Sequence, residues 1–398
     1  MGHVDHTRAI LWARLPRVGR CAITLEHGAS IQTIEGEARD EHDRCVRFEA
    51  RDLAPASDYR YELRQGAEVL AAGPTCRFRT APAPETPARV KLALGSCAAS
   101  EPSSVWSTIM LAGAEGLVLL GDTPYIDSTD LNVAREKHRR FLEVPELACL
   151  ARTLPVWGTW DDHDFGKNDS DGTLPGKAEA RRAFVEYRAH VNDGDGEGGV
   201  YTSFRRGPIE VFLLDARWFA RTAPVSATDP RPTLLGEAQW QWLFHGLLAS
   251  TAPFKVIASG MIWDDKENSE SDDWGSYPYE RERLERFIGE YVIPGVVLVG
   301  GDIHVSRHLR YPESKARAGY VLDQLIVSPL HERVIPSLDV PHPALLWSAR
   351  EPRVFLTLEA STLGEAPTLE ACWVQDTGRG AGRELRGARW TAQELSAR

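Results

Sequence analysis

The chain has 398 residues, of which 42% are hydrophobic and 26% are charged, a composition typical of globular proteins with a buried core. Asp and Glu outnumber Lys and Arg by 57 to 46, and the net charge of −11 argues against a nucleic-acid-binding surface. The apolar runs are too short to cross a membrane, so we expect no transmembrane segment.

Up to residue 84 the sequence predicts strands only. Short alternating runs, separated by turn residues, lie at 9–13, 21–26, 46–50, 59–63 and 76–79. The turn before Tyr59 is similar to the corner of fibronectin-type sandwiches, where a tyrosine hydroxyl fixes the chain. We therefore expect a small all-β domain, fibronectin- or Ig-like, over residues 1–84, followed by a proline-rich linker at 85–90.

From residue 91 to 398 the pattern changes to alternating strands and helices, which predicts an α/β (α+β) catalytic domain. Helical periodicity predicts helices at 132–148, 176–190, 234–248 and 281–292. Apolar runs predict strands at 90–94, 116–120, 154–159, 210–214, 255–258, 296–299, 354–358 and 369–374. Several of these strands end in polar residues, and the ends of strands are where sites form in layered α/β folds.

The most acidic of these strand ends is the segment 160–169, directly after the strand at 154–159. It contains one imidazole and four carboxylates: Asp161, Asp162, His163, Asp164 and Asp169. Carboxylates so crowded repel one another unless a cation lies among them. A solvated acidic turn is the alternative interpretation of this segment taken alone.

Three other strand ends have matching chemistry. They carry Cys97, then Asp122 with Tyr125, and finally Asp302 with His304. Each group alone has an ordinary structural explanation, since a lone cysteine is usually a small buried hydrophobe. Together, thiolate, phenolate, carboxylates and imidazole suit a hard trivalent ion beside an oxygen-preferring divalent ion, with one shared carboxylate. A pair of metal ions of this kind is suited to phosphoester hydrolysis.

At this point the sequence resembles a known family, the PhoD-type alkaline phosphatases. Their site plan is similar to that of purple acid phosphatases and other calcineurin-like metallophosphoesterases. The resemblance rests on Gly-Ser-Cys97, Gly-Asp122-x-x-Tyr125, Trp-Asp-Asp162-His163-Asp-Phe-Gly-x-Asn168, Leu-Asp215-x-Arg217, Leu235-Gly236-Glu237-x-Gln239-Trp240 and Gly-Gly-Asp302-Ile-His304. It implies a four-layer metallophosphoesterase sandwich of two mixed sheets flanked by helices, preceded by the all-β domain.

The resemblance also implies roles for individual residues. Cys97, Asp122, Tyr125 and His304 are expected around Fe³⁺, with Asp122 as the bridging carboxylate. Asp162, Asn168 and Asp302 are expected to bind Ca²⁺, although Asp161 could replace one of them. A pair of divalent ions such as Mn²⁺ or Zn²⁺ is the alternative metal content.

Two further residues are expected to act on the substrate. His163 is the candidate that protonates or stabilises the leaving oxygen. Arg217 is expected to hold the phosphate through its forked donors.

The sequence departs from the wider calcineurin-like pattern at one point. Those enzymes usually carry a histidine after the strand that corresponds to 255–258, where this chain has Ser259-Gly260-Met261. The departure is consistent with calcium, which favours oxygen ligands. It leaves the ligand set of the second metal open.

The function predicted from the sequence is a metal-dependent phosphoric ester hydrolase, a phosphomonoesterase with some phosphodiesterase activity. The alternative is a phospholipase D-like diesterase acting on lipid head groups or teichoic-type polymers, with Trp263, Trp274, Tyr277 and Tyr279 either lining its entrance or packing a loop. A non-enzymatic binding module has weaker support. The family is commonly exported, yet no export signal begins this chain. We expect a cytoplasmic protein as written, or a periplasmic or secreted one if the chain is a mature or trimmed form.

Overall fold

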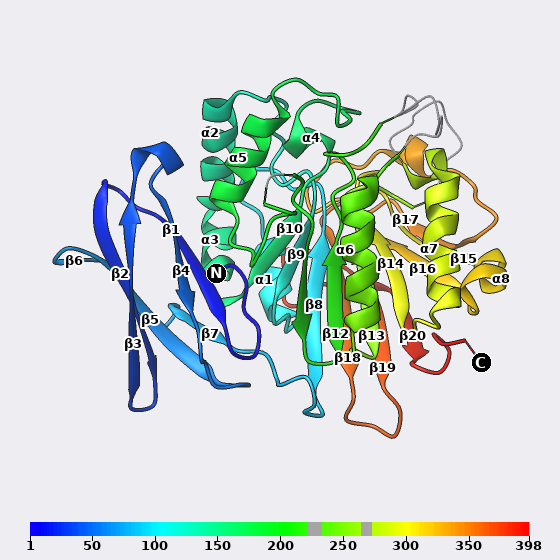
Figure 1. Cartoon of the computed structure of the whole chain (residues 1–398), viewed down its shortest axis with the longest axis horizontal. Coiled ribbons are helices and arrows are strands. Elements are labelled where there is room, and N and C mark those ends of the chain that lie inside the picture. The colour runs from blue at the N-terminus through cyan, green and yellow to red at the C-terminus, as the bar shows by residue number, and fades with distance from the viewer. Residues whose placement is uncertain (197, 222–232, 264–272, 398) are drawn as a thin grey trace.

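A computed structural model describes residues 1–196, 198–221, 233–263 and 273–397. The N-terminal strands lie to one side of a larger body in which two sheets are flanked by helices (Figure 1). Within the described residues, no helix is both long and apolar enough to span a membrane.

The first seven strands make sheets of their own. β1 pairs with β4, while β3, β2, β5 and β6 form a second sheet in that order and β7 pairs with β5. The strands are β1 Ala9–Arg14, β2 Gly19–His27, β3 Ser30–Ala38, β4 Cys45–Ala50, β5 Asp58–Gln65, β6 Glu68–Ala71 and β7 Arg77–Arg79. The strand predictions here are confirmed, but β3 and β6 were not predicted from the sequence. β3 alternates exposed and half-buried residues and so lacks a clear apolar face.

The Tyr59 hydroxyl accepts a hydrogen bond from the backbone N–H of Ala54 at 2.7 Å, as the corner motif predicts. Inside these sheets, side chains such as Ile23, Leu25, Phe48 and Phe78 form a hydrophobic cluster separate from the cores of the larger body. The N-terminal strands therefore have a core of their own.

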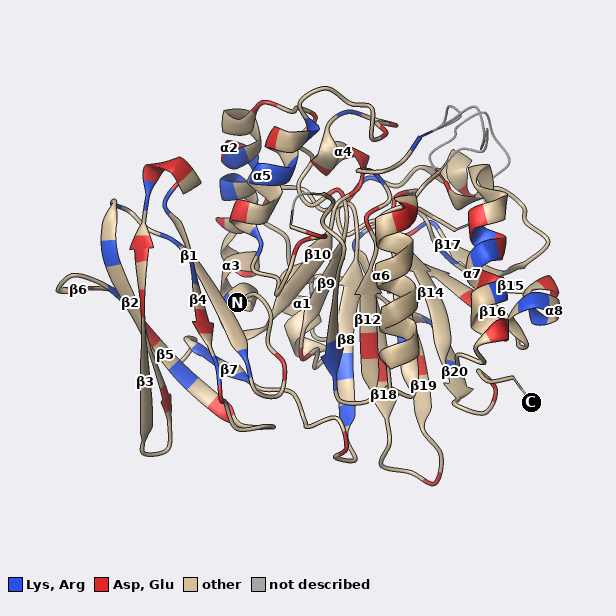
Figure 2. Ribbon diagram, in the orientation of Figure 1, with Lys and Arg blue, Asp and Glu red and all other residues tan. Residues whose placement is uncertain are grey.

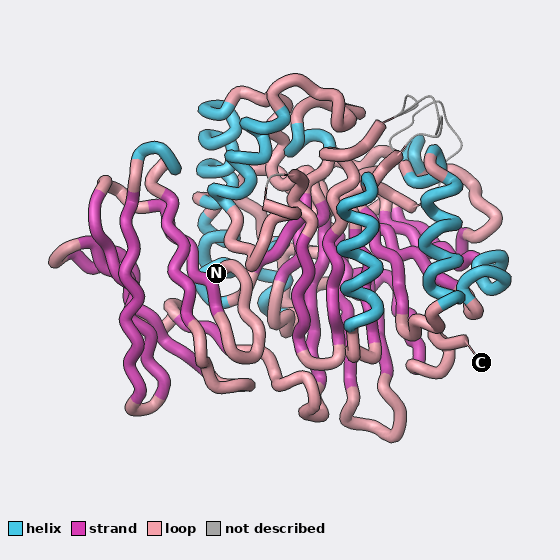
Figure 3. The backbone as a smooth tube through the Cα atoms, in the orientation of Figure 1, coloured by secondary structure: helices cyan, strands magenta, loops and turns pink. Residues whose placement is uncertain are grey.

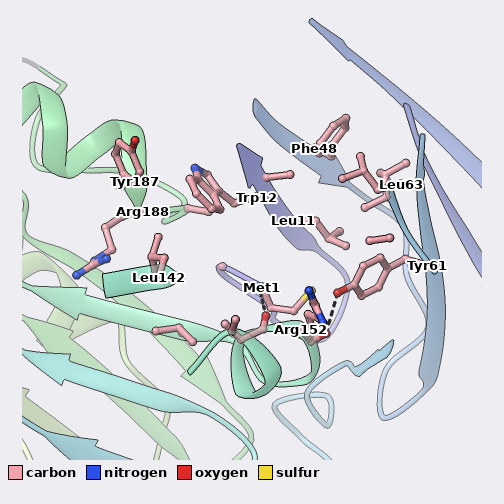
Figure 4. Close-up of a pocket in the computed structure, with 18 of the residues that line it drawn as sticks. Met1, Leu11, Trp12, Phe48, Tyr61, Leu63, Leu142, Arg152, Tyr187 and Arg188 are labelled. Carbon is pink, nitrogen blue, oxygen red and sulfur yellow. Dashed lines mark hydrogen bonds between the residues drawn. The ribbon is translucent and has the colours of Figure 1, made fainter. Parts of the chain in front are cut away.

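The N-terminal sheets also bond to the larger body. Trp12 donates from its indole to the carbonyl of Glu186 at 2.8 Å, and the Tyr61 hydroxyl donates to the carbonyl of Arg152 at 2.9 Å. A cavity of about 280 Å³ remains between the two parts, lined mainly by apolar side chains such as Leu11 and Leu63 (Figure 4).

The first sheet of the larger body has the order β10-β9-β8-β18-β19-β20. Its strands are β8 Arg89–Gly95, β9 Leu117–Leu120, β10 Val156–Thr159, β18 Val354–Ser361, β19 Thr368–Gln375 and β20 Arg383–Thr391. β8, β9 and β10 are parallel, whereas β18 pairs antiparallel with both β8 and β19. β8 begins at Arg89, inside the expected linker, and the domain boundary remains a prediction.

The second sheet has the order β11-β12-β13-β14-β16-β15-β17. Its strands are β11 Thr202–Arg206, β12 Ile209–Leu213, β13 Phe254–Ala258, β14 Val296–Gly300, β15 Ser306–Tyr311, β16 Leu322–Ile326 and β17 Leu345–Ala349. The run β12, β13, β14, β16 is parallel and the outer pairings are antiparallel, so this sheet is mixed as well. Mixed sheets with helices agree with the expected fold class.

The two sheets share one core, and helices cover their outer faces (Figure 3). Because side chains alternate along a strand, Val118 and Leu120 of β9 join the core between the sheets, while Leu117 and Leu119 pack with the helices on the other side. The helices are α1 Val105–Leu111, α2 Leu131–Leu142, α3 Pro145–Thr153, α4 Asp162–Phe165, α5 Lys177–Tyr187, α6 Gly236–Ala249, α7 Pro278–Glu290 and α8 Lys315–Ala318.

The single helix predicted at 132–148 is wrong, because the structure has two helices there, α2 and α3. The break lies at Val144, whose ψ of 119° is extended, just before Pro145 begins α3. A proline disfavours helical geometry in the residue before it and cannot donate a helical hydrogen bond. The apolar periodicity continues across the break, which is why the pattern alone suggested one helix.

The aromatic residues suggested as an entrance lining are mostly core residues. Trp263, Trp274 and Tyr277 are buried, and the rings of Trp263 and Trp274 stack with centroids 4.0 Å apart. Tyr279 is half-buried at the surface. The packing interpretation of this segment is therefore the one that the structure supports.

Candidate metal centre

The polar ends of four strands meet at one edge of the two sheets. β8, β9 and β10 are parallel neighbours, so their carboxyl ends deliver Cys97, Asp122 and Asp162 to the same edge. From the second sheet, β14 leads to Asp302, whose backbone carbonyl accepts a hydrogen bond from the Cys97 thiol at 3.2 Å. Acidic residues gather in the loops next to α4 at this end of the molecule (Figure 2).

Four of these residues have a left-handed backbone conformation. Their φ angles are 56° at Cys97, 53° at Asp122, 68° at Asp302 and 54° at His304. Residues other than glycine seldom adopt such angles, and strained conformations cluster at functional sites. All four are among the seven metal ligands expected from the sequence.

Two groups of possible ligand atoms share one carboxylate. The atoms of Cys97, Asp122 and His304 lie within 4.8 Å of one another, and so do those of Asp122, Asp162 and His163. The Cys97 thiol lies 3.6 Å from Oδ2 of Asp122, while Oδ1 of Asp122 is buried with no hydrogen-bond partner among the described residues. Asp122 is therefore common to both groups and has one oxygen atom without a partner there.

Tyr125 lies at the side of the first group. Its hydroxyl lies 2.9 Å from Nε2 of His304 and 3.2 Å from Nε2 of His331. His331 was not singled out in the sequence, although it follows β16 by only a few residues. Strand β16 was not predicted from the sequence, so nothing marked His331 as a residue at the end of a strand.

A pocket of about 550 Å³ opens over these groups. Asp122, Tyr125, Asp162, Asn168, Asp302 and His304 all line it, together with His163. Asn168 is exposed at its edge, and the backbone N–H of Asp169 bonds to Asp162 Oδ2 at 2.8 Å. Every expected metal ligand except Cys97, which is fully buried beneath it, reaches this pocket.

His163 is oriented by a residue that the sequence did not indicate. Its Nδ1 lies 2.5 Å from Oδ1 of Asp127. Because the carboxylate accepts, Nδ1 carries the proton and Nε2 is the nitrogen left for other contacts. Asp127 follows Asp122 by five residues and also lines the pocket.

Arg217 does not line the pocket. Its guanidinium is buried, with 1% exposure, and its Nε donates to Oδ1 of Asp161 at 2.6 Å. This pairing holds Oδ1 of Asp161, while its Oδ2 is buried without a hydrogen-bond partner among the described residues. Asp162 is the member of the acidic pair that belongs to a group of possible ligand atoms. The phosphate contact expected of Arg217 therefore has no support from the geometry.

Another arginine does reach the site. Arg333 is exposed, lines the pocket and has no ion pair with any residue in the described part of the chain. Arg333 lies between the strands predicted at 296–299 and 354–358, in a stretch for which the sequence predicted no element, and it was not singled out as a site residue.

The comparisons with known proteins agree with this geometry. The sequence model of the PhoD-like phosphatases matches residues 121–343, more than half of the chain. The chain belongs to the PhoD-like phosphatase family. Alkaline phosphatase D of Bacillus subtilis (strain 168) is 27% identical over 317 residues, which are 66% of this chain and 53% of that protein. The chain thus spans about half the length of this curated relative.

Two solved structures share the fold. The structure of PhoD superposes with a TM-score of 0.80 at 19% identity, covering 100% of this chain and 90% of that one. The purple acid phosphatase PPD1 from yellow lupin (Lupinus luteus) seeds superposes with a TM-score of 0.69 at 10% identity, covering 98% and 73%.

In this PhoD-like chain, burial disfavours the charged forms of Cys97, Asp122 and His304. Burial, followed by the Asp122 carboxylate, raises the pKa of the Cys97 thiol, and burial with the charges of Asp162 and Asp161 raises the pKa of Asp122. Burial lowers the pKa of His304 to about 3. A cation at the centre would reverse these penalties, because it favours thiolate and carboxylate. The unpartnered Asp122 oxygen and the mixed sulfur, oxygen and nitrogen donors therefore fit a metal centre.

In the segment after β13 of this PhoD-like chain, Gly260 is tightly packed. At Gly260 an added Cβ would lie 2.7 Å from Cβ of Asp161 and 2.8 Å from the carbonyl oxygen of Trp160. No side chain fits there without moving the loop that carries the acidic pair.

We predict that Arg217 supports the fold of the site and does not bind phosphate. Arg217→Met should lower the free energy of unfolding by about 3–5 kcal/mol, because it leaves the buried Asp161 carboxylate unpaired. Adding Asp161→Asn should recover much of this loss in denaturant titrations. A cost below about 1 kcal/mol for Arg217→Met would contradict the prediction.

Proposed function

We propose that this protein is a metal-dependent phosphoric ester hydrolase, a phosphomonoesterase that also accepts phosphodiesters. The observation that carries the proposal is the pair of ligand groups that share Asp122. Membership of the PhoD-like phosphatase family supports the same reaction class.

The donor set suggests how the metals divide. Cys97, Asp122, Tyr125 and His304 suit Fe³⁺, while Asp162, Asn168 and Asp302, with Asp122 shared, suit Ca²⁺. Two divalent ions such as Mn²⁺ or Zn²⁺ are the alternative. Metal ions held in this way supply positive charge for the phosphate oxygens and lower the pKa of water. His331, through its contact with Tyr125, would orient the phenol.

The protein's own side chains supply the remaining steps. Asp127 holds Nδ1 of His163, which lines the pocket. When the imidazole is protonated on both nitrogens, Nε2 can give its proton to the leaving oxygen while Nδ1 keeps its own proton and its bond to Asp127. Arg333, at the rim, is the cation available to hold a phosphate oxygen, and we assign it the role first expected of Arg217. The phosphate charge is then balanced on a protein whose surface is otherwise acidic.

The finer architecture is part of the same proposal. Residues 1–84 would form a fibronectin- or Ig-like domain, supported by their separate core and the Tyr59 corner. Residues 91–398 would form the four-layer catalytic sandwich.

The proposed function is tested with p-nitrophenyl phosphate and bis(p-nitrophenyl) phosphate, assayed with iron and calcium across pH. We expect p-nitrophenol release from both esters, and its loss after chelation. Correctly metallated protein that turns over neither ester would overturn the proposal.

His163→Ala is predicted to lower kcat by about 10²–10⁴, the usual contribution of a general acid, while metal content changes little. Asp127→Asn should lower kcat by a smaller factor, because it only weakens the hydrogen bond that orients the imidazole of His163. Elemental analysis of each variant provides the control. If His163→Ala loses metal in proportion to activity, His163 is a ligand instead.

Arg333→Gln is predicted to raise the inhibition constant of inorganic phosphate by about tenfold, the size expected for one charged hydrogen bond. Arg389→Gln, an exposed arginine paired with Glu370 on an outer strand, is the matched control and should change nothing. An unchanged inhibition constant in Arg333→Gln would remove it from the site.

Tyr125→Phe tests the iron assignment. A phenolate on ferric iron produces a visible charge-transfer band, so the metallated wild type should be coloured. Tyr125→Phe should bleach or shift the band, and Cys97→Ser should shift it independently. Tyr320→Phe, at another buried tyrosine, is the control. Iron-loaded wild type without such a band would favour the divalent pair.

A further inference from the structure

We propose that a second pocket, of about 410 Å³, binds the ester substituent that stays on phosphorus when a phosphodiester is cleaved. The inference rests on the proposed function and adds a subsite to it. The ligand class that this pocket fits is an uncharged aryl or short alkyl group.

The pocket adjoins the metal centre. Tyr125, His304 and Arg333 line both it and the acidic pocket, so a phosphate held at the centre can extend a substituent into either space. His331 lines the second pocket but not the acidic one, and its ring centroid lies 5.7 Å from that of Tyr125.

The floor of this pocket is apolar. Val105 and Trp106, from α1, and Leu330 are buried there, and the small side chain of Ala99 leaves space above them. A floor of this kind contributes to binding mainly by burying apolar surface.

The charges at the rim are of both signs. Glu332 pairs with Arg353 at 3.1 Å, Glu101 is an exposed carboxylate, and Arg333 is the cation shared with the phosphate site. A neutral substituent therefore fits better than a charged one. The volume of the pocket is at the small end of the range for ligand sites, enough for one ring.

The position of His163 indicates which of the two ester groups of a phosphodiester occupies the apolar pocket. His163 and its partner Asp127 line the acidic pocket but not the apolar one. The Tyr125 ring lies next to both sides, 4.7 Å from the His163 ring and 5.7 Å from the His331 ring by centroid. The alcohol that takes a proton from His163 must leave on the acidic side, so the apolar pocket faces the group that remains.

The reaction then balances simply. A water oxygen forms a bond to phosphorus as the bond from phosphorus to the leaving alcohol oxygen breaks. The alcohol takes up one proton, and the water gives up one. The phosphomonoester product keeps its second substituent, which occupies the apolar pocket.

The test uses three esters with the same leaving group, namely p-nitrophenyl phosphate, methyl p-nitrophenyl phosphate and phenyl p-nitrophenyl phosphate. We expect wild type to show kcat/KM about tenfold higher for the phenyl diester than for the methyl diester, as expected when a ring enters an apolar pocket. Ala99→Phe, which fills the pocket, should lower kcat/KM about tenfold for the phenyl diester and less than twofold for the monoester.

Ala99→Ser keeps the pocket open and is the matched control. If Ala99→Phe does not fold or load metal, Ser103→Leu narrows the same pocket from its half-buried mouth. Equal losses on all three esters, or no loss on any, would overturn the subsite. Absence of p-nitrophenol release from every ester by metallated wild type would instead overturn the proposed function.

Discussion

The crowding of carboxylates at one edge of the two sheets is the constraint on which the rest of this structure depends. Five aspartates gather there, and burial makes each negative charge costly. The fold compensates two of them with its own groups. Asp161 pairs with the buried Arg217, while Asp164 accepts backbone N–H groups from Thr123 at 2.9 Å and Asp161 at 3.0 Å. Asp162 likewise accepts backbone N–H groups from His163 and Asp169, both at 2.8 Å, and it is Asp122, Asp162 and Asp302 that we propose as ligands of a cation.

The two compensated aspartates also position the others. Asp164 joins the loop after β9 to the loop after β10, since its carboxylate holds the backbone that carries Asp122 as well. Asp215 does similar work nearby, accepting from the Trp160 indole at 2.7 Å and the backbone of Arg217 at 2.9 Å. Much of the acidic sequence motif is thus scaffold, and a smaller part of it faces the pocket.

The sequence alone was sufficient to predict which residues lie at the ends of several strands. It was insufficient to predict the residues that surround them in the folded site. Apolar runs that stop at Gly-Asp or Gly-Ser-Cys located Cys97, Asp122 and Asp302, because a buried strand and its polar end leave a local pattern. Asp127, His331 and Arg333 leave none, since their partners are distant in the chain or lie in the pocket. The role predicted for Arg217 meets a related limit, since the structure pairs this residue with the buried Asp161. A forked cation near an acidic motif suits a phosphate and a buried carboxylate equally well, and only the fold decides between them.

The close contact at Gly260 limits how this site can change. A side chain there would press against Cβ of Asp161 and the carbonyl oxygen of Trp160, and moving Asp161 would disturb its pairing with the buried Arg217. A larger residue at Gly260 is therefore compatible with this fold only if the loop that carries Trp160 and Asp161 shifts as well. Packing behind the acidic loop thus restricts which side chains can be placed beside the candidate metal centre.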